Sequence, residues 1–489
     1  MIINRELRKS WDMQSNSECQ QLVVSYVGED GHIKFMTYNV PSHEMFEWDY
    51  AKQKNQIIAN YQSFDGKPVK RVPKKHSLSK ERIYQILFDL NKNNQINAIF
   101  DNNTPKTYFW DIENDISDDG SIDPNAAAMP ITVMSWVKFP EVTVFSTKSL
   151  SAVQIDNIQN KIYKHCEKFD NTPKYKFIYK VYNSEYDMLL DFSTNYLRFA
   201  DAVSGWNIWG YDWLYYYNRC EYLGINLKNI ICPTGEFHTI KNDNGDIIKV
   251  PKHKLIYDYL ACFKKWDRSI EVKESYKLDF IGDVVCGVKK VQHKLGLKEM
   301  WEQTPDEYVF YNAIDSILVE QIHKKAKTAN AMYGLANLTR AEVYEVFGTI
   351  SSVEIVQNEY LYKENKVVPI GVQKNDFKEY EGAFVFKPDP GIHKWVLGLD
   401  YASLYPSTIR QFNISPETFM FKDKAYNRTS NEIKCASGAV FSKETDGFMP
   451  KILSHFYAER KRHKKEMKNA DAIKNELIKI YNERVSKNI

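Results

Sequence analysis

Acidic side chains at three separate places in the 489-residue sequence have the types and spacing needed to hold metal ions. Asp111 and Glu113 are separated by one residue at the end of an apolar stretch, and in a β-strand both would project from the same face. Asp212 stands at the start of an expected helix. Tyr311 and Asp315 are four residues apart and would lie on one face of a further helix. The sequence therefore offers four carboxylates and a tyrosine for one site.

Ligand sets made only of oxygen atoms suit hard cations such as Mg²⁺ or Mn²⁺. Two such ions, about 4 Å apart, promote phosphodiester hydrolysis when one lowers the pKa of the attacking water and the other stabilises the leaving oxygen. Taken singly, an Asp-x-Glu or a Tyr-x-x-x-Asp pattern occurs in ordinary loops and helices, so a non-catalytic fold with coincidental carboxylates is the alternative. All the elements together, in this order, favour a two-metal nuclease.

These residues resemble the three exonuclease motifs of the DEDD superfamily in its tyrosine variant, whose members remove nucleotides from DNA 3′ ends. The resemblance implies an RNase H-like 3′-5′ exonuclease domain. It also implies that the metal ligands are Asp111, Glu113, Asp212 and Asp315. Tyr311 would orient the attacking water.

A second group of candidate functional residues begins at Asp400, which follows the apolar stretch Trp395 to Leu399 and precedes a Tyr-Pro turn. The stretch predicts a strand that ends in a carboxylate, and a buried aromatic corner is the alternative interpretation. Residues 400–407 match motif A of the family B DNA polymerases, Asp-x-x-Ser-Leu-Tyr-Pro-Ser, throughout. With its flanks, the chain resembles the replicative polymerases of T-even-type bacteriophages over nearly its whole length in motif order.

This second resemblance implies roles in nucleotide polymerisation. Asp400 would hold both catalytic metals, and Tyr405 would pack under the incoming sugar and exclude a 2′-hydroxyl. The backbone amides near Ser403 and Leu404 would face the triphosphate.

Basic residues near the C-terminus add a further piece. Arg460 and Lys464 are four residues apart in an expected helix, with Lys461 beside them, so the first two project from one face and could bind a triphosphate. Residues 450–467 resemble the first fingers helix of the same polymerases at these positions. A solvated helix face is the alternative interpretation.

Two motifs of a complete polymerase site are not found after motif A. Residues 445–447 are the nearest approach to the expected Asp-Thr-Asp turn and lack its first aspartate, and residues 330–334 resemble the end of the second fingers helix but precede motif A. Asp400 alone cannot hold two metals against the charge of a triphosphate. We therefore expect the N-terminal subunit of a split family B replicative DNA polymerase with 3′-5′ proofreading exonuclease activity.

The expected partners follow from that function. They are DNA primer-template, single-stranded DNA 3′ ends, dNTP, and a second polypeptide that supplies the rest of the palm, fingers and thumb. Any contact with a sliding clamp would be made through that second polypeptide. Each active site would use two Mg²⁺ or Mn²⁺ ions. The alternatives are a stand-alone 3′-5′ DNA exonuclease with a vestigial palm, a fragment of a full-length polymerase, and a non-catalytic DNA-binding subunit.

The elements that must position these residues predict a multidomain α/β (α+β) protein. The expected elements are strands at 107–112 and 131–139, helices at 205–222 and 305–325, hairpins at 19–40 and 239–250, and a long charged helix after residue 450. The helical spacing of Ile473, Leu477 and Ile480 predicts that this last helix packs on another element, and polar and proline-rich residues predict a boundary near 370–390. The expected domains are an N-terminal domain at 1–104 with a return segment at 333–368, the exonuclease domain at 105–332, a partial palm at 369–446 and the first fingers helix at 447–489.

Composition limits the class of protein. A hydrophobic content of 43% beside 26% charged residues is typical of a soluble globular protein, and the net charge of +3 does not by itself indicate a nucleic-acid partner. The seven cysteines never form a CxxC pair, which argues against a disulfide framework and a structural zinc. No apolar run reaches the roughly 20 residues that span a bilayer, so we expect no membrane association and a cytoplasmic location, in the host cell if the protein is viral.

Overall fold

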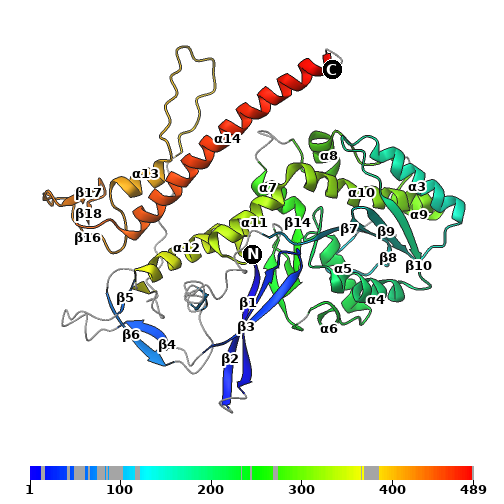
Figure 1. Ribbon diagram of the computed structural model, residues 1–489, viewed down its shortest axis with the longest axis horizontal. Helices are drawn as coiled ribbons and strands as arrows, with labels where there is room; N and C mark the ends of the chain where they lie inside the picture. Colours follow the sequence, from blue (N-terminus) through cyan, green and yellow to red (C-terminus); the bar gives the residue numbers. More distant parts are fainter. Residues whose placement is uncertain are drawn as a thin grey trace. The chain divides into compact units, whose positions relative to one another are not determined.

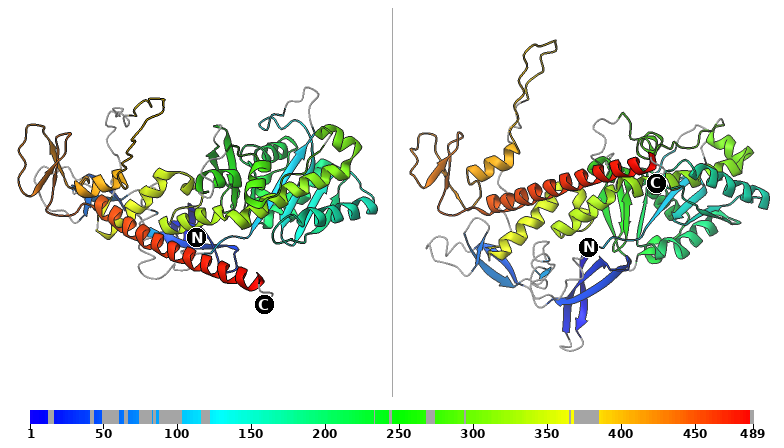
Figure 2. Two further views of the ribbon diagram at one scale, coloured as in Figure 1. Left: turned by 90° about the horizontal axis from the view of Figure 1, so that it is seen from above. Right: turned by 45° about the horizontal axis from the view of Figure 1, so that its top comes forward.

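The structure is a computed structural model of the chain (Figures 1 and 2). It describes residues 1–12, 17–40, 44–48, 61–63, 67–73, 83, 86–87, 103–115, 122–232, 234–242, 245–267, 274–293, 295–364, 366–367 and 385–486. The chain forms two compact units, residues 1–40 with 93–352 and residues 41–92 with 353–489. The domain limits expected from the sequence stay a prediction.

The first unit is built on a six-stranded mixed sheet in the order β10-β9-β8-β7-β11-β14. Its strands are β7 (Thr107–Asn114), β8 (Ile131–Lys138), β9 (Glu141–Ser146), β10 (Lys176–Val181), β11 (Ala202–Gly205) and β14 (Leu255–Asp258). β7, β8 and β9 are antiparallel neighbours, whereas β7, β11 and β14 run parallel. The parallel strands place their carboxyl ends at one edge of the sheet, where α/β proteins commonly bind ligands.

Helices pack against this sheet (Figure 1). Every residue of β8 except the last is buried, because both faces of the sheet are covered. The helical elements are α3 (Ala152–Cys166), α4 (Glu185–Asn195), η2 (Leu197–Phe199), α5 (Asp212–Tyr222), α6 (Leu227–Ile231), α7 (Tyr259–Trp266), α8 (Leu278–Cys286), α9 (Leu297–Gln303), α10 (Pro305–Ala326), α11 (Thr328–Thr339) and η3 (Glu345–Phe347). This mixed sheet with its helices confirms the predicted α/β fold class.

α10 shows how the sequence specifies a site-bearing helix. It begins with Pro305, whose missing N–H costs nothing in the first turn, and acidic residues in that turn and basic ones in the last complement the helix dipole. Its residues from Tyr308 to Ile322 are all buried, and it contacts β7, β8 and β9. The helix expected at 305–325 is therefore confirmed, whereas the one expected at 205–222 begins only at Asp212.

Two antiparallel hairpins match the prediction. β1 (Ile2–Asp12), β2 (Ser17–Val27) and β3 (Ile33–Val40) form a three-stranded sheet, and β2 and β3 are the hairpin expected at 19–40. β12 (Phe237–Lys241) and β13 (Ile247–Pro251) form the second hairpin, with Thr239 opposite Lys249.

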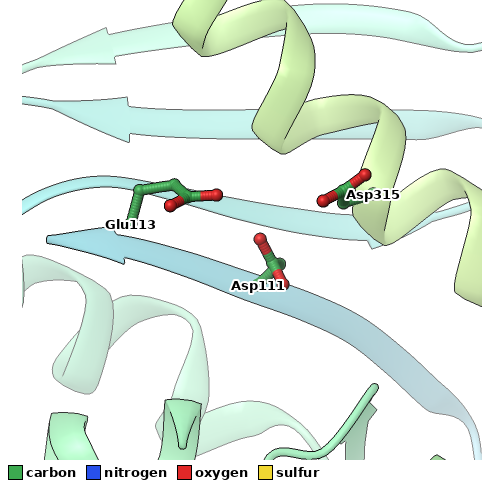
Figure 3. A group of neighbouring side chains, drawn as sticks. All are labelled: Asp111, Glu113 and Asp315. Atoms are coloured by element: carbon green, nitrogen blue, oxygen red, sulfur yellow. The ribbon is translucent and has the colours of Figure 1, made fainter. Parts of the chain in front are cut away.

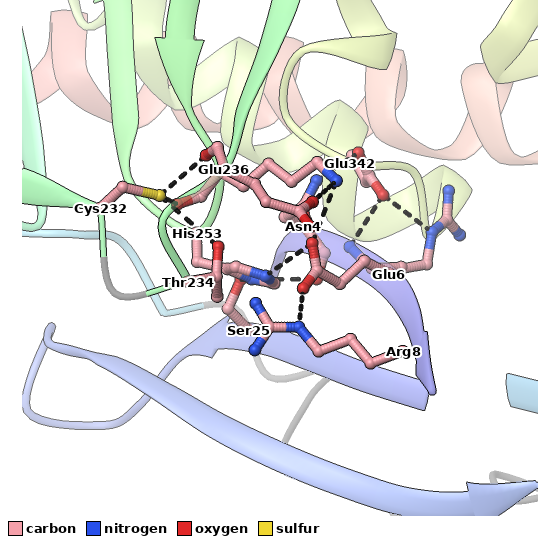
Figure 4. Close-up of polar contacts among 11 residues, drawn as sticks. Asn4, Glu6, Arg8, Ser25, Cys232, Thr234, Glu236, His253 and Glu342 are labelled. Carbon is pink, nitrogen blue, oxygen red and sulfur yellow. Dashed lines mark hydrogen bonds and ion pairs between the residues drawn. The ribbon is translucent and has the colours of Figure 1, made fainter. Parts of the chain in front are cut away.

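A buried polar network joins the N-terminal sheet to the residues that follow β13 (Figure 4). His253 Nδ1 lies 2.8 Å from Ser25 Oγ, and its Nε2 lies 3.5 Å from Glu6 Oε2. Burial alone would raise the pKa of Glu6, but hydrogen bonds from His253, Arg8 and Lys252 lower it to about 2. Ser25, His253 and Glu6 contact one another in the sequence serine, histidine, carboxylate that is typical of a hydrolytic triad. All three are buried away from any substrate, so the network is structural.

In the part of the chain that the structure describes, the second unit contains two small sheets and several helices. Its strands are β4 (Glu44–Trp48), β5 (Tyr61–Ser63), β6 (Pro68–Pro73), β15 (Lys366–Val367), β16 (Phe419–Lys422), β17 (Glu432–Lys434) and β18 (Ala439–Ser442), and its helices are α12 (Thr349–Lys363), α13 (Leu404–Gln411) and α14 (Phe448–Ser486). Val356 and Leu361 of α12 pack on Phe448 and Ile452 of α14, which is the long helix expected near the C-terminus. Among the described residues, no helix is both long and apolar enough to cross a bilayer.

Two expectations for this unit are wrong. Trp395 to Leu399 do not form a strand; Trp395 is 99% exposed and Leu399 is 88% exposed. A strand needs a hydrogen-bonded neighbour, and no described segment pairs with this one. Ile473, Leu477 and Ile480 of α14 were expected to pack on another element but are exposed in the described part of the chain. Most of the boundary region expected at 370–390 lies outside the described residues.

Arg5 offers a test of how the N-terminal sheet is anchored. Its side chain, 3% exposed, pairs with Glu342 at 3.3 Å and with Glu345 at 2.6 Å. Arg5→Leu should lower the free energy of unfolding by about 3–5 kcal/mol, because it leaves buried carboxylates without their cation. Urea denaturation followed by tryptophan fluorescence measures the change.

The matched control is Lys34→Ala, which breaks the exposed pair of Lys34 with Asp30. It should cost less than about 1 kcal/mol. Equal effects of the two substitutions would show that the Arg5 pairs do not stabilise the unit.

Candidate active site

Three carboxylates from two elements meet at one place. Asp111 and Glu113 project from the same face of β7, with Ile112 buried between them, and Asp315 comes from α10. One oxygen of each carboxylate lies within 4.8 Å of the others. The three groups point toward a common space (Figure 3). The structure thus brings together three of the four predicted upstream carboxylates.

Asp212 is placed beside this cluster but engages the backbone. It begins α5, and its Oδ1 accepts a hydrogen bond of 3.0 Å from the amide of Ile112. The loop before it passes close to β7 because Gly205 has no side chain; a Cβ there would lie 2.5 Å from the carbonyl oxygen of Trp110. The charge of Asp212 contributes to the raised pKa of Asp111, so the fourth carboxylate is electrostatically part of the site.

Burial raises the pKa of every carboxylate here. The pKa of Asp111 lies well above its ordinary value because of burial and the charges of Asp212 and Glu113. Burial and the charge of Asp315 raise the pKa of Glu113 to about 8. Burial raises the pKa of Asp212 to about 7, and it also raises that of Asp315 although Lys290 opposes the effect. Without a bound cation, part of the cluster is therefore protonated near neutral pH.

Lys290 is a site residue that the sequence analysis missed. Its Nζ lies 2.5 Å from Asp315 Oδ2 and donates a hydrogen bond of 2.8 Å to the hydroxyl of Tyr311. Burial alone would lower the pKa of Lys290, but the charges of Asp315, Tyr311 and Asp111 raise it above its ordinary value. Lys290 thus supplies a permanent positive charge to the cluster. It follows α8 in a loop, and no motif or spacing in the sequence marks it.

Two further side chains hold the site in place. Asn312 Nδ2 donates a hydrogen bond of 2.8 Å to Asp111 Oδ2. Asp258, at the end of β14, accepts hydrogen bonds from the amides of Asn207 and Trp209 and so fixes the loop that leads to Asp212. Asn312 follows Tyr311 in the predicted motif and could have been found from its position in the helix; Asp258 carried no such signal.

The donor set fits divalent metal ions. All of its ligand atoms are oxygens, as Mg²⁺ and Mn²⁺ prefer. Asp315 Oδ1 is buried and has no hydrogen-bond partner among the described residues. A buried carboxylate oxygen without a partner is costly unless a cation or a donor joins it. This carboxylate oxygen without a hydrogen-bond partner lies beside Asp111 and Glu113, where a bound metal ion would coordinate it.

The residues predicted for nucleotide polymerisation are mostly exposed. Asp400, Leu404 and Tyr405 are exposed and Ser403 is half-buried, all at or just before the start of α13, and within the described residues Asp400 belongs to no group of three or more possible metal ligands. Ser403 adopts a left-handed backbone conformation, with φ of 54°, immediately before the helix.

The basic residues predicted for the triphosphate lie on α14, against which α13 packs. Arg410 of α13 donates a hydrogen bond to Ser454, and both its guanidinium and the ammonium of Lys461 lie over the ring of Tyr457, at 4.9 and 4.6 Å. Arg460 and Lys464 are exposed on the same helix. The structure therefore brings the helix of motif A next to the basic helix, without completing a metal site there.

Comparison with known proteins identifies two matching families. Residues 68–281 match the DNA polymerase family B exonuclease domain, and residues 350–484 match DNA polymerase family B. The first match includes Asp111, Glu113 and Asp212, and the second includes Asp400.

Individual relatives share this relationship. The chain is 29% identical over 322 residues to the DNA-directed DNA polymerase of Escherichia phage RB69, covering 62% of this chain and 35% of that protein. It is 28% identical over 339 residues to the DNA-directed DNA polymerase of Enterobacteria phage T4, covering 64% and 37%. It is 26% identical over 292 residues to DNA polymerase 1 of Pyrococcus abyssi, covering 57% and 36%. The match spans about a third of the length of these relatives.

The raised pKa values make metal binding depend on pH. Between the ordinary carboxylate values and about pH 8, the folded protein holds more protons than the unfolded chain, so the metal-free protein should lose stability as pH rises. Mn²⁺ must displace those protons, so its apparent affinity should rise at least tenfold between pH 6 and pH 8. The measurement is the Mn²⁺-induced shift of the thermal midpoint at each pH.

Glu113→Gln is the control, because it removes the group whose pKa is raised to about 8. In that variant the Mn²⁺-induced shift should be small and should vary less with pH. An equally large shift at both pH values in the unmodified protein would contradict the link between metal and protons.

Proposed function

Because the chain belongs to family B of the DNA polymerases, with an exonuclease domain and part of a polymerase domain, we propose that it removes nucleotides from DNA 3′ ends by two-metal hydrolysis. The observation that supports this most strongly is the cluster of Asp111, Glu113 and Asp315 with the unpartnered oxygen of Asp315. The substrates would be single-stranded DNA 3′ ends and the end of a primer on its template.

Four carboxylates would hold the ions in this proposal. Asp111, Glu113 and Asp315 would contribute directly, and Asp212 would join them from the start of α5. Two Mg²⁺ or Mn²⁺ ions, when bound, lower the pKa of an attacking water and stabilise the leaving oxygen.

The chain's own residues would then position the reactants. Burial raises the pKa of Tyr311, so its hydroxyl keeps its proton, while the oxygen of that hydroxyl already accepts a hydrogen bond from Lys290. The hydroxyl proton can therefore be donated to the attacking water. Lys290 also offsets the negative charge of Asp315, and Asn312 fixes the orientation of Asp111.

Substitution of a cluster carboxylate tests the exonuclease proposal. Asp111→Asn and Glu113→Gln should each lower kcat/KM on a 5′-labelled single-stranded oligonucleotide by about a thousandfold, because each removes a metal ligand. Tyr311→Phe should lower kcat by about 10- to 100-fold with little change in KM, because only water positioning is lost.

The matched control is Asp283→Asn, an acid of α8 in an exposed pair with Lys289. It should leave the rate unchanged. Undiminished digestion by Asp111→Asn, or a Mn²⁺-loaded protein with no nuclease activity, would refute the proposal and favour a non-catalytic DNA-binding subunit.

We further propose that the second unit forms part of a polymerase site, with DNA primer-template and dNTP as substrates. Asp400 would hold the metals, Tyr405 would pack under the sugar, and the amides near Ser403 and Leu404 would face the triphosphate. Arg460, Lys461 and Lys464 would bind the triphosphate from α14. The match of residues 350–484 to the family supports this assignment.

The rest of the palm, the fingers and the thumb would come from a second polypeptide, which would also bring any contact with a sliding clamp. The specific observation that favours this is the exposed apolar segment before motif A: Val396 and Leu397 are exposed as well as Trp395 and Leu399. Apolar side chains gathered on a surface commonly mark a protein interface. The predicted limits, a partial palm at 369–446 and a fingers helix at 447–489, belong to the same proposal.

Reconstitution tests the second proposal. Primer extension should require both this chain and the second polypeptide, and Asp400→Asn should abolish it while Asp389→Asn, an exposed acid nearby, should not. Trp395→Ser should weaken the association of the two polypeptides by about tenfold or more, because it removes a large apolar contact.

The outcomes separate the alternatives. No extension with any polypeptide encoded beside this one would favour a stand-alone exonuclease with a vestigial palm. Gene sequence that continues in frame beyond residue 489 would identify the chain as a fragment of a full-length polymerase.

A further inference from the structure

A lysine-lined cavity lies near the carboxylate cluster, within the same unit. Its volume is about 430 Å³. Lys241, the last residue of β12, lines it from the hairpin, and Lys264 and Lys265 line it from the last turn of α7. Asn207 and Trp209, from the loop that leads to α5, form a further part of the wall.

The sheet topology places this cavity at the edge that carries the cluster. Asp258 lines the cavity and is the last residue of β14, where it lies opposite Gly205 of the parallel strand β11. β11 also runs parallel to β7, with Ser204 opposite Phe109. Adjacent strands are about 4.8 Å apart, so the end of β14 lies roughly 10 Å across the sheet from Trp110, the residue before Asp111 in β7. A DNA strand whose 3′ end lies at the cluster can reach the cavity.

Among the described residues that line the cavity, Asp258 is the one acidic residue, and both of its carboxylate oxygens already accept hydrogen bonds. Oδ1 accepts hydrogen bonds from the amides of Asn207, Leu260 and Ala261, and Oδ2 accepts one from the amide of Trp209. Its charge is therefore spread over four backbone donors at the start of α7.

Two ammonium groups of the cavity, those of Lys241 and Lys265, have room for an anion, and the ammonium of Lys264 lies over the ring of Tyr276, 5.6 Å from its centroid. Lys265 donates a hydrogen bond to the carbonyl of Phe347, and burial lowers its pKa. Among the described residues, no carboxylate lies within ion-pair distance of Lys241 or Lys265. Like charges gathered on one concave wall repel each other unless an anion joins them. Phosphate groups are the anions that a nuclease substrate carries at regular intervals.

We propose that this cavity binds backbone phosphates of the DNA strand being digested, on the 5′ side of the scissile bond. The proposal rests on the proposed exonuclease function and adds a subsite to it. Lys241, Lys264 and Lys265 position the strand; they do not touch the reacting atoms. Because each contact is made to a phosphate, the subsite reads no base sequence.

Binding and digestion by the full chain test the subsite. In EDTA, where no hydrolysis occurs, the Kd for a single-stranded oligonucleotide should rise about tenfold in Lys264→Ala/Lys265→Ala. The slope of log K against log salt should become shallower by about 0.7 for each lysine removed. Digestion of a dinucleotide, whose one phosphate is the scissile one, should be unchanged.

Two further variants show whether a loss of binding comes from the lost lysines or from misfolding. Lys241→Ala removes an exposed side chain at a strand end, so it should show the single-lysine change in salt slope at an unchanged thermal midpoint. Lys174→Ala/Lys176→Ala is the matched control, because these exposed lysines lie in and beside β10 at the far edge of the sheet. That control should bind like the unmodified chain.

The possible failures are distinguishable. An unmodified chain that digests neither the dinucleotide nor the oligonucleotide refutes the exonuclease function itself. Normal digestion with an unchanged salt slope in the Lys241, Lys264 and Lys265 variants overturns the subsite alone. If these variants bind the strand normally but escape inhibition by a nucleoside monophosphate, the cavity holds the released product and the proposal is wrong.

Discussion

The loss of hydration around a cluster of carboxylates is the constraint on which the rest of this site depends. Burial is the largest cause of the raised pKa values of Asp111, Glu113 and Asp212, and the charges of Asp212, Glu113 and Asp315 raise the pKa of Asp111 further. Lys290 offsets only part of that charge. A fold that buries so many acids together is stable in its ionised form only when cations join them. The same unfavourable arrangement would give the site the affinity for metal ions that we propose.

The sheet gathers these groups from distant parts of the sequence. Parallel strands end at a common edge, so the loops after β7, β11 and β14 meet there although many residues separate them. Asp258 ties the loop after β11 to the start of α7, and α10 crosses the sheet to deliver Asp315. Negative charge at one strand end and positive charge two strands away produce a field along this edge that suits an extended polyanion.

The two units differ in how completely their predicted site residues are buried and held by other residues. In the first, Asp212, Tyr311 and Asp315 are buried and Asp111 and Glu113 are half-buried, and all of them except Glu113 have a hydrogen bond or an ion pair among the described residues that holds the side chain. In the second, Asp400 stands among exposed apolar side chains, and α14 carries exposed Ile473 and Leu477 well beyond its contact with α12. Leaving such residues in water forgoes the free energy that their burial would provide. This contrast is the physical basis of the proposal that a further polypeptide covers the second unit.

The sequence by itself determined the elements and most of the acidic site. Period-two spacing put Asp111 and Glu113 on one face of a strand, and four-residue spacing put Tyr311 and Asp315 on one helical face, because these periodicities are local properties of the backbone. Only the tertiary structure decided that Lys290 would pair with Asp315, since a loop lysine carries no periodic signal. Likewise, the apolar stretch from Trp395 predicts a strand from the sequence, but the structure forms none there. A strand exists only where a neighbouring segment completes its hydrogen bonds, and the presence of that neighbour is a property of the whole fold.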